Sequence, residues 1–407
     1  MKVFGGLHLY EEEEKNRIYR VSREEGSPMK NVYLIACVVL SSFTGTMSAS
    51  VSDADDLLKL CAEQAVIKAG DAVNSGNMLI WNQGQLDTNQ ASCVTAGKWL
   101  KLSGYAQVRY QYPEHATAGF DIHRARLDFS GNVADSIDYK LQPAFEGSAA
   151  KLLDAYVDYM AGDYLKFTAG QFKIPFSREN LISSRYLATI NRSQIVEALV
   201  ARSKDIIGNQ NGRDIGIGAG GDFLMLNDTY FFEYAIAVLN GQGIDTMDLN
   251  DQKDFDGRLL IHPIRGLSLG GDYYSGRYAL SNVTGSSYER TRVGAELAYV
   301  HDPVSVEAEF IRGRDGYRSG SGRALVRRQG WYVQGTYFML QHHLQWVLKY
   351  DTYNPDIKTG DTSTIYTIGM NWYFTTMTRL QIDYEIRNVR GAPQESNLLA
   401  AQFQAGF

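Results

Sequence analysis

The sequence predicts an all-β protein, a sixteen-stranded antiparallel transmembrane β-barrel, and three observations carry this prediction. The 407 residues include 26 Tyr, 17 Phe and 39 Gly but only 8 Pro, a composition that favours β structure. Apolar and polar residues alternate with a period of two along most of the chain after residue 98. The mean hydropathy of −0.27 is compatible with a barrel, because only one face of each barrel strand is apolar.

The N-terminal region predicts an exported protein. Residues 29–49 have a basic start, a short apolar core and a small-residue zone, the three parts of a secretory signal peptide. We expect cleavage near Ala49. Residues 1–28 are charged and without pattern, so we expect a non-native upstream extension, with the true start at Met29. The tetrapeptide Leu34-Ile35-Ala36-Cys37 also fits a lipoprotein cleavage box, although it lies within the apolar core.

Residues 50–97 are predicted to form a short periplasmic helix followed by a polar linker. Acidic residues near Asp53 favour a helix N-terminus, and Gly70 is a suitable end. Cys61 and Cys93 remain after cleavage, and they are candidates for a disulfide in an oxidising compartment. Two separate thiols are the alternative.

The predicted barrel occupies residues 98–407. In its first strand Leu102 and Ala106 lie on one face, whereas Gln107 and Arg109 lie on the other. About a dozen alternating residues suffice to cross a bilayer at a tilt. The sixteen predicted strands cover residues 99–111, 124–131, 137–146, 153–159, 164–176, 212–223, 228–240, 253–262, 266–276, 287–300, 303–312, 328–339, 342–353, 362–374, 378–389 and 397–407.

The connections between these strands alternate between short turns and longer loops. An even strand number with short turns at one end and long loops at the other is typical of outer-membrane barrels. Closure also removes the exposed edges that a sheet of this size would otherwise have. The final strand ends at Phe407, and a terminal aromatic residue resembles the signal read by the barrel-insertion machinery.

The alternation stops between residues 177 and 213. This stretch carries six basic residues against three acidic ones, and its segment 190–201 has apolar residues at roughly helical spacing. Long structured loops between regular elements are usually functional. We therefore expect a loop that folds into the barrel as a constriction, with its charge presented by Arg178, Arg185, Arg192, Arg202 and Lys204.

Two further basic sets have candidate roles. On the polar strand faces, which would line the lumen, lie Arg109, Arg124, Arg126, Lys140, Arg290 and Arg292. Such rings of cations select anions, but the same arginines can instead brace the wall by pairing with Asp128, Asp138, Asp383 and Glu385. The predicted loop 313–327 and its flank form an outer basic patch, either a capture funnel for anions or a grip on lipopolysaccharide: Arg314, Arg318, Arg323, Arg327 and Arg328.

Other sequence motifs give weaker evidence of function. The segment 216–221 contains G-x-G-x-x-G, but a dinucleotide site needs a helix after these glycines, and here a turn follows. The His and Cys residues show no metal-ligand spacing, and no Ser-His-acid set can be assembled from spacing. We therefore predict no cofactor, no metal and no enzymatic activity.

Three stretches make the sequence similar to the phosphate-selective porin O/P family of Gram-negative outer membranes. They are Leu102-Ser-Gly-Tyr-Ala-Gln-Val-Arg109, Ile122-His-Arg-Ala-Arg-Leu-Asp-Phe-Ser-Gly131 and Gly170-Gln-Phe-Lys-Ile-Pro-Phe-Ser177. The resemblance spans about residues 98–407. It implies a homotrimer of sixteen-stranded pores, each narrowed by an inward loop.

Together these observations predict an outer-membrane porin that passes small hydrophilic solutes and prefers phosphate or other small anions. Expected partners are outer-membrane lipids and lipopolysaccharide, the solutes themselves and the barrel-insertion machinery, with no nucleic acid. A general or sugar-permeable porin without anion preference is the alternative within this class. A soluble β-rich binding protein and a barrel enzyme are the alternatives from other classes.

Overall fold

The computed structural model describes residues 94–96, 98–226, 229–279, 286–319, 322–340, 342–389 and 397–407. The predicted signal peptide, periplasmic helix and cysteine pair lie outside these residues. The described elements are β1 (Val94–Ala96), β2 (Leu100–Pro113), β3 (Gly119–Ala134), β4 (Ile137–Ala144), β5 (Lys151–Gly162), β6 (Leu165–Lys173), α4 (Arg178–Leu181), α5 (Gln194–Leu199), β7 (Arg213–Leu226), β8 (Thr229–Leu239), β9 (Asp254–Ile264), β10 (Leu267–Tyr278), β11 (Tyr288–His301), β12 (Val304–Ser319), β13 (Gly322–Met339), β14 (Leu344–Asn354), β15 (Ser363–Tyr373), β16 (Arg379–Val389) and β17 (Leu398–Gly406).

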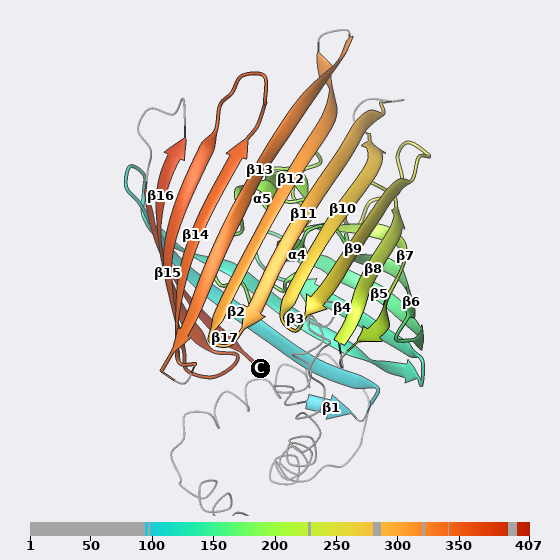
Figure 1. Cartoon of the computed structure of the whole chain (residues 1–407), viewed down its shortest axis with the longest axis horizontal. Helices are drawn as coiled ribbons and strands as arrows, with labels where there is room; N and C mark the ends of the chain where they lie inside the picture. The colour runs from blue at the N-terminus through green and yellow to red at the C-terminus, as the bar shows by residue number, and fades with distance from the viewer. Residues whose placement is uncertain are drawn as a thin grey trace, which may run out of the picture. The chain divides into compact units, whose positions relative to one another are not determined.

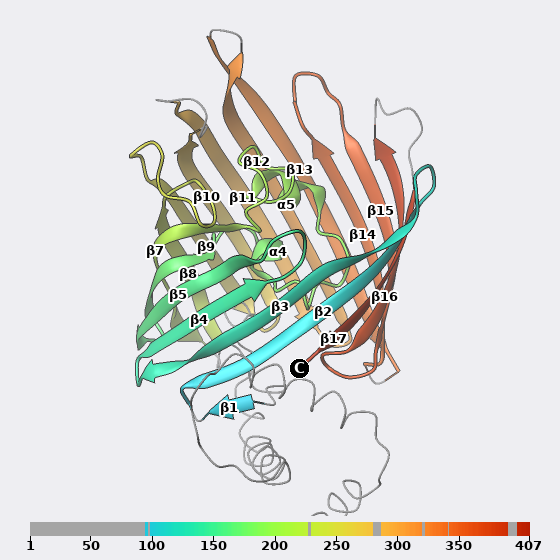
Figure 2. The ribbon, with the colours of Figure 1, turned by 180° about the vertical axis from the view of Figure 1, so that it is seen from behind.

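Strands β2 to β17 close into a sixteen-stranded antiparallel barrel (Figure 1, Figure 2). Each strand pairs with the next along the chain, and β17 pairs with β2 from Leu398↔Pro113 to Gly406↔Tyr105. Beyond that pairing, Gly104 and Phe407 exchange two backbone hydrogen bonds of 3.0 Å each. The short β1 pairs only with the first residues of β2 in the described chain. The predicted fold class and strand number are confirmed.

The barrel is polar inside and apolar outside. On β14 and β15, Leu348 lies opposite Ile368, and these outward side chains are 63% and 49% exposed. The next residue along β14, Lys349, points inward and is buried. Polar lumen positions and an apolar outer band are what a lipid-facing barrel requires. Neither α4 nor α5, the helices of the described chain, is long and apolar enough to cross a membrane.

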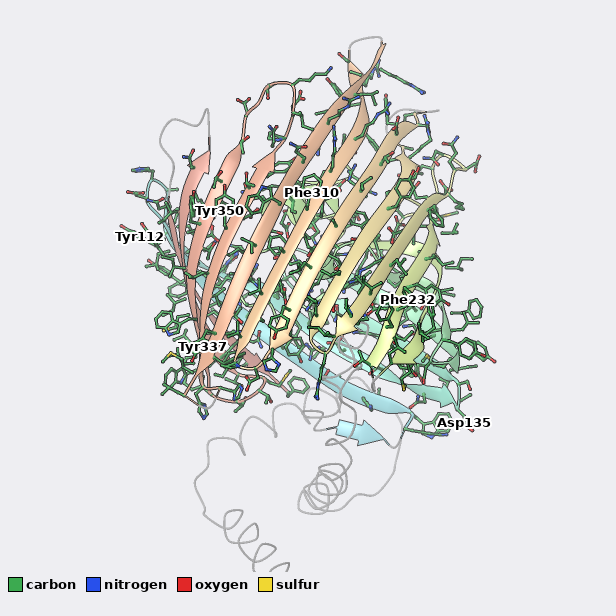
Figure 3. All side chains as sticks on the ribbon, in the orientation of Figure 1. Tyr112, Asp135, Phe232, Phe310, Tyr337 and Tyr350 are labelled. Atoms are coloured by element: carbon green, nitrogen blue, oxygen red, sulfur yellow. The ribbon has the colours of Figure 1, made fainter. Side chains whose placement is uncertain are left out.

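Aromatic side chains lie on the outer face toward both ends of the barrel. Phe310 and Tyr350 lie nearer the long-loop end, and Tyr337 lies nearer the short-turn end (Figure 3). Trp331 packs against Tyr350 with ring centroids 4.8 Å apart. Aromatic girdles at both membrane interfaces flank the apolar band of outer-membrane barrels, so these rings indicate where the lipid band ends.

One predicted loop is wrong. Residues 313–319 and 322–327 continue β12 and β13 as a regular ladder, in which Arg314 lies opposite Arg327 and Ser319 opposite Gly322. The hairpin rises at the long-loop end of the barrel (Figure 1). Apolar alternation disappears there because both faces of a strand beyond the membrane meet water, whereas the backbone hydrogen bonds continue. For the same reason β3 begins at Gly119, before its predicted start.

The glycine-rich segment 216–221 lies within β7, as expected for a strand and not for a nucleotide-binding turn. A Cβ atom on Gly216 would stand 2.1 Å from the carbonyl oxygen of Val238 on β8. Glycine here therefore permits close approach of two neighbouring strands.

Candidate functional site

The segment between β6 and β7 carries α4 and α5 into the interior of the barrel (Figure 2). Ser177 caps α4, because its hydroxyl accepts a hydrogen bond from the backbone N–H of Asn180 at 3.3 Å. α5 forms within the predicted apolar segment, and its Ile195 and Leu199 are buried. We call residues 174–212 the inner loop.

An apolar core attaches the inner loop to one side of the wall. Ile195, Val196 and Leu199 belong to one buried cluster with Ile311 of β12 and Tyr332 of β13. Burial of an Ile, Val or Leu side chain contributes about 1.5–3 kcal/mol. These residues therefore position α5 against β12 and β13.

Four wall carboxylates hold the backbone of the inner loop, and only one of them, Asp383, was suggested by the sequence, as a bracing acid. They lie on every second strand from β10 to β16. A hydrogen bond to a charged acceptor contributes about 1.5–3 kcal/mol. Asp272 accepts from the N–H of Ser177 at 3.3 Å, Glu309 from Glu179 at 2.7 Å, Asp351 from Gln194 at 2.7 Å, and Asp383 from Ile190 at 2.7 Å.

Two of the predicted loop cations have carboxylate partners on the wall. Arg178 lies 3.2 Å from Glu307 of β12, and Arg185 forms an ion pair with Asp128 of β3. Lys204 is exposed. The arrangement of Arg178 and Arg185 is that of braces between the loop and the wall.

Arg192 and Arg202, the other two predicted loop arginines, are held by neutral oxygens. Arg192 donates to the carbonyls of Glu179 at 3.2 Å and Ile182 at 2.8 Å, and Arg202 donates twice to the amide oxygen of Asn180. Neither has a described carboxylate within 4 Å of its guanidinium nitrogens. Carbonyls at the end of α4 are free to accept these donors because a helix leaves its last carbonyls unbonded.

Lys173, the last residue of β6, joins the same group. Its Nζ donates to the carbonyl of Leu181 at 2.7 Å and to that of Ile182 at 3.2 Å, so it shares an acceptor with Arg192. Sequence reasoning missed this residue, although it lies in the third family-like stretch. Arg124 of β3 is connected to Arg192 through Gln107 and Ser184, because Arg124 donates to Gln107, Gln107 donates to the Ser184 carbonyl, and Arg192 donates to the Ser184 hydroxyl. We call Arg124, Lys173, Arg192 and Arg202 the cationic cluster.

Glycine at position 212 shapes this cluster. Gly212 has a φ of +71°, and a Cβ atom there would stand 1.8 Å from Oδ1 of Asn180 and 3.0 Å from Nη2 of Arg202. Glycine is therefore required both by the backbone conformation and by the space that Asn180 and Arg202 occupy.

Most predicted lumen cations on the strands form ion pairs, although the partner of Arg290 is Asp205 of the inner loop and not a residue of the wall. Arg124 differs, because it donates to the amide oxygen of Gln107 at 2.9 Å, has no described carboxylate within 4 Å, and lies in electrostatic range of Arg192. The pairs are Arg109–Asp121 at 2.6 Å, Arg126–Glu146 at 2.6 Å, Lys140–Asp128 at 3.2 Å, Arg290–Asp205 at 3.1 Å and Arg292–Asp315 at 2.7 Å.

The suggested bracing acids have different partners. Asp128 pairs with Lys140 and Arg185, as the bracing interpretation expects. Asp383 instead accepts a loop N–H, and Glu385 pairs with Arg387 and accepts a bond from Asn191 at 2.7 Å. Asp383 and Glu385 of β16 thus both accept hydrogen bonds from the inner loop.

Residues 102–406 match the family described as phosphate-selective porin O and P. The chain belongs to this family. The family and the closed barrel point to a porin channel of the outer membrane and not to an enzyme.

Among the solved structures that resemble this porin in fold are an OmpF and an OmpT. OmpF of Salmonella typhi in complex with daunomycin has a TM-score of 0.55 and 12% identity, covering 76% of this chain and 97% of that chain. In-vitro folded OmpT of Vibrio cholerae, in its trimer form, has a TM-score of 0.54 and 11% identity, covering 76% of this chain and 99% of that chain. At these identities the likeness concerns the fold alone. No curated protein matches the sequence significantly.

Within this porin, exposure does not distinguish the cluster arginines from the braced ones. Arg124, Arg192 and Arg202 are 9%, 7% and 6% exposed, the braced Arg126 and Arg185 are 8% and 6% exposed, and Arg178 and Arg290 are 2% and 1% exposed. The cluster therefore differs from the braced arginines in its hydrogen-bond partners and not in its burial.

The closely spaced cations of the inner loop shift the pKa values of their neighbours. Burial and the adjacent Arg192 hold the pKa of Arg202 well below its usual range. Burial alone would raise the pKa of Glu197, but Arg202 and hydrogen bonds from Ser203 outweigh it and keep that pKa below its usual range. Glu197 is therefore an ionised carboxylate that faces the cationic cluster at neutral pH.

The predicted outer basic patch divides between two faces of the β12–β13 hairpin. Arg328 lies 3.4 Å from the lumen-facing Asp315. Arg314 and Arg327 are exposed and lie opposite each other, and Arg318 lies opposite Arg323 nearer the tip. The five arginines therefore do not form one surface.

Proposed function

We propose that this porin is a water-filled channel for small hydrophilic solutes, that it prefers anions, and that the inner loop is its constriction. The observation that carries the anion preference is the cationic cluster held by neutral oxygens. A carbonyl or amide partner carries no net charge to offset that of a cation, whereas a carboxylate partner largely cancels it. Cations that line a pore favour anions.

Exposure supports a passage between the inner loop and strands β3 to β5. There the inward side chains of Lys140 and Glu146 remain 22% and 20% exposed. On the far wall, Arg290 and Asp383 are 1% and 0% exposed beneath the loop. The far wall, including the carboxylate of Asp383, is thus covered by the loop, whereas the passage keeps both a cation and a carboxylate in contact with solvent, Lys140 and Glu146.

Reversal potentials in planar bilayers under a salt gradient test the preference. We expect an anion-selective wild type, and a weaker preference in the double variant Arg192→Gln/Arg202→Gln. At about 7 Å in water a unit charge contributes about 0.6 kcal/mol, and screening at 0.15 M salt reduces this to about 0.25 kcal/mol. Each charge stabilises an anion and destabilises a cation by this amount. Removing two charges therefore changes the ratio of anion to cation permeability roughly fivefold.

The matched control removes two exposed cations outside the lumen, Arg265→Gln and Lys358→Gln. It should leave the reversal potential unchanged. A cation-selective or neutral wild-type pore would contradict the anion preference. An unchanged reversal potential in Arg192→Gln/Arg202→Gln would show that the cluster does not determine selectivity.

A general or sugar-permeable porin is the second candidate. The observation that favours it is the number of lumen cations already paired with carboxylates, together with Glu197 facing the cluster. In that case the reversal potential should be near zero and sugars should permeate in a liposome-swelling assay.

We also infer a homotrimer in the Gram-negative outer membrane, reached through the signal peptide of residues 29–49. The family membership and the trimer form of the similar OmpT support this inference. N-terminal sequencing of the membrane-extracted protein should begin near Ser50, and native mass spectrometry should give three copies. A protein left in the periplasmic fraction would contradict the location.

A further inference from the structure

The β12–β13 hairpin carries arginines on its outer face, just beyond two lipid-facing aromatic residues. Phe310 and Trp331 lie opposite each other and are 41% and 42% exposed. Arg312 and Arg314 follow Phe310 at two-residue intervals on the same strand face, and Arg327 lies directly opposite Arg314. At the rise of a β-strand, Arg312 and Arg314 stand about 7 Å and about 13 Å beyond Phe310.

The alternate residues of β12 establish which face this is. Glu309 accepts the N–H of Glu179 on the inner loop, and Asp315 pairs with the lumen-facing Arg292. Residues 312 and 314 therefore point away from the lumen, and both are exposed. A solute inside the channel does not meet them, whereas a lipid beside the barrel does.

The charges on this face are unbalanced. Like charges directly opposite each other destabilise a pair of strands, and Arg314 and Arg327 are such a pair. Glu289 forms an ion pair with Arg314 at 3.2 Å, and its side chain and that of Arg314 are 34% and 46% exposed. Three arginines against this one carboxylate leave an excess of two positive charges that a bound anion would compensate.

We propose that Arg312, Arg314 and Arg327 bind the phosphate groups of an anionic lipid of the outer leaflet. Aromatic belts sit at the level of lipid headgroups, so a lipid packed against Phe310 and Trp331 brings its phosphates to these arginines. Guanidinium groups bind phosphate bidentately, which fits this use of arginine. The site lies outside the channel and is independent of the proposed anion preference.

Native mass spectrometry of the full-length protein in detergent micelles tests the proposal, with diphosphoryl lipid A as the probe. The test variant is Arg312→Gln/Arg314→Gln/Arg327→Gln. One basic residue near an anionic headgroup strengthens binding roughly fivefold, so three removals should weaken it roughly a hundredfold. Monophosphoryl lipid A should bind more weakly than diphosphoryl lipid A to the wild type and equally to the variant.

The matched control removes three exposed cations elsewhere, Lys98→Gln, Arg265→Gln and Lys358→Gln, and should bind like the wild type. Equal weakening in this control, or unchanged binding in the test variant, would overturn the proposal. Displacement of the lipid by a tenfold excess of inorganic phosphate would mean that the site takes free phosphate, which also overturns it. Heat-modifiable gel migration checks folding, and the single variant Arg327→Gln should still show the fivefold loss if the triple variant fails to fold.

Discussion

Asp351 offers a quantitative test of how the inner loop is held. Its Oδ2 accepts the N–H of Gln194 at 2.7 Å, at the first residue of α5. This charge-assisted bond contributes about 1.5–3 kcal/mol, and the anion at a helix start about 0.3–1 kcal/mol more. Asp351→Ala should therefore lower the free energy of opening α5 by about 2–4 kcal/mol, and Asp351→Asn, which keeps an acceptor oxygen, by about 1 kcal/mol.

Hydrogen exchange measured by mass spectrometry on the full-length protein reports this opening. Amide exchange across residues 190–201 should accelerate roughly 30-fold to several hundredfold in Asp351→Ala and roughly fivefold in Asp351→Asn. The control is Asp158→Asn, because Asp158 bonds to Thr168 within the wall and not to the loop. It should leave this segment unchanged.

Two results would refute the reasoning. Unchanged exchange in residues 190–201 would mean that the apolar core around Ile195 holds the loop without the carboxylate. Equal acceleration in the wall strands would mean that Asp351 stabilises the whole barrel and has no specific role at the loop.

Three further predictions concern the cluster, the loop and barrel closure. Gly212→Ala should displace Asn180 and Arg202 and shift the reversal potential less than Arg202→Gln does, because the charge of Arg202 is moved and not removed; an unchanged potential would argue against a role for the position of Arg202. Lys349→Met leaves the carboxylate of Glu179 without its 2.8 Å partner and should cost about 3–5 kcal/mol in denaturant unfolding, part of which Glu179→Gln recovers. Deletion of Phe407 removes two backbone hydrogen bonds with Gly104, which together stabilise the barrel by about 1–3 kcal/mol. The barrel should therefore unfold at a lower temperature in the heat-modifiable gel assay, and an unchanged temperature would contradict that contribution.

Sequence alone was sufficient for the fold class, the strand number and most of the wall. Each membrane strand must be apolar toward lipid and polar toward the lumen, so strands such as β14 and β15 are visible as alternation in the sequence. The same logic failed for residues 313–327, because beyond the lipid nothing requires one apolar face. The composition of residues 177–213 also marked the inner loop, because its arginines and apolar segment break the period of two.

Only the tertiary structure decided which cations are braced and which keep their charge. Arg178 and Arg192 are equivalent in the sequence, yet Arg178 meets Glu307 while Arg192 meets carbonyls at the end of α4. The loop's carboxylate anchors come from β10 to β16, more than 90 residues away along the chain. The closed barrel brings these distant strands around the loop, and a local sequence pattern does not predict such contacts.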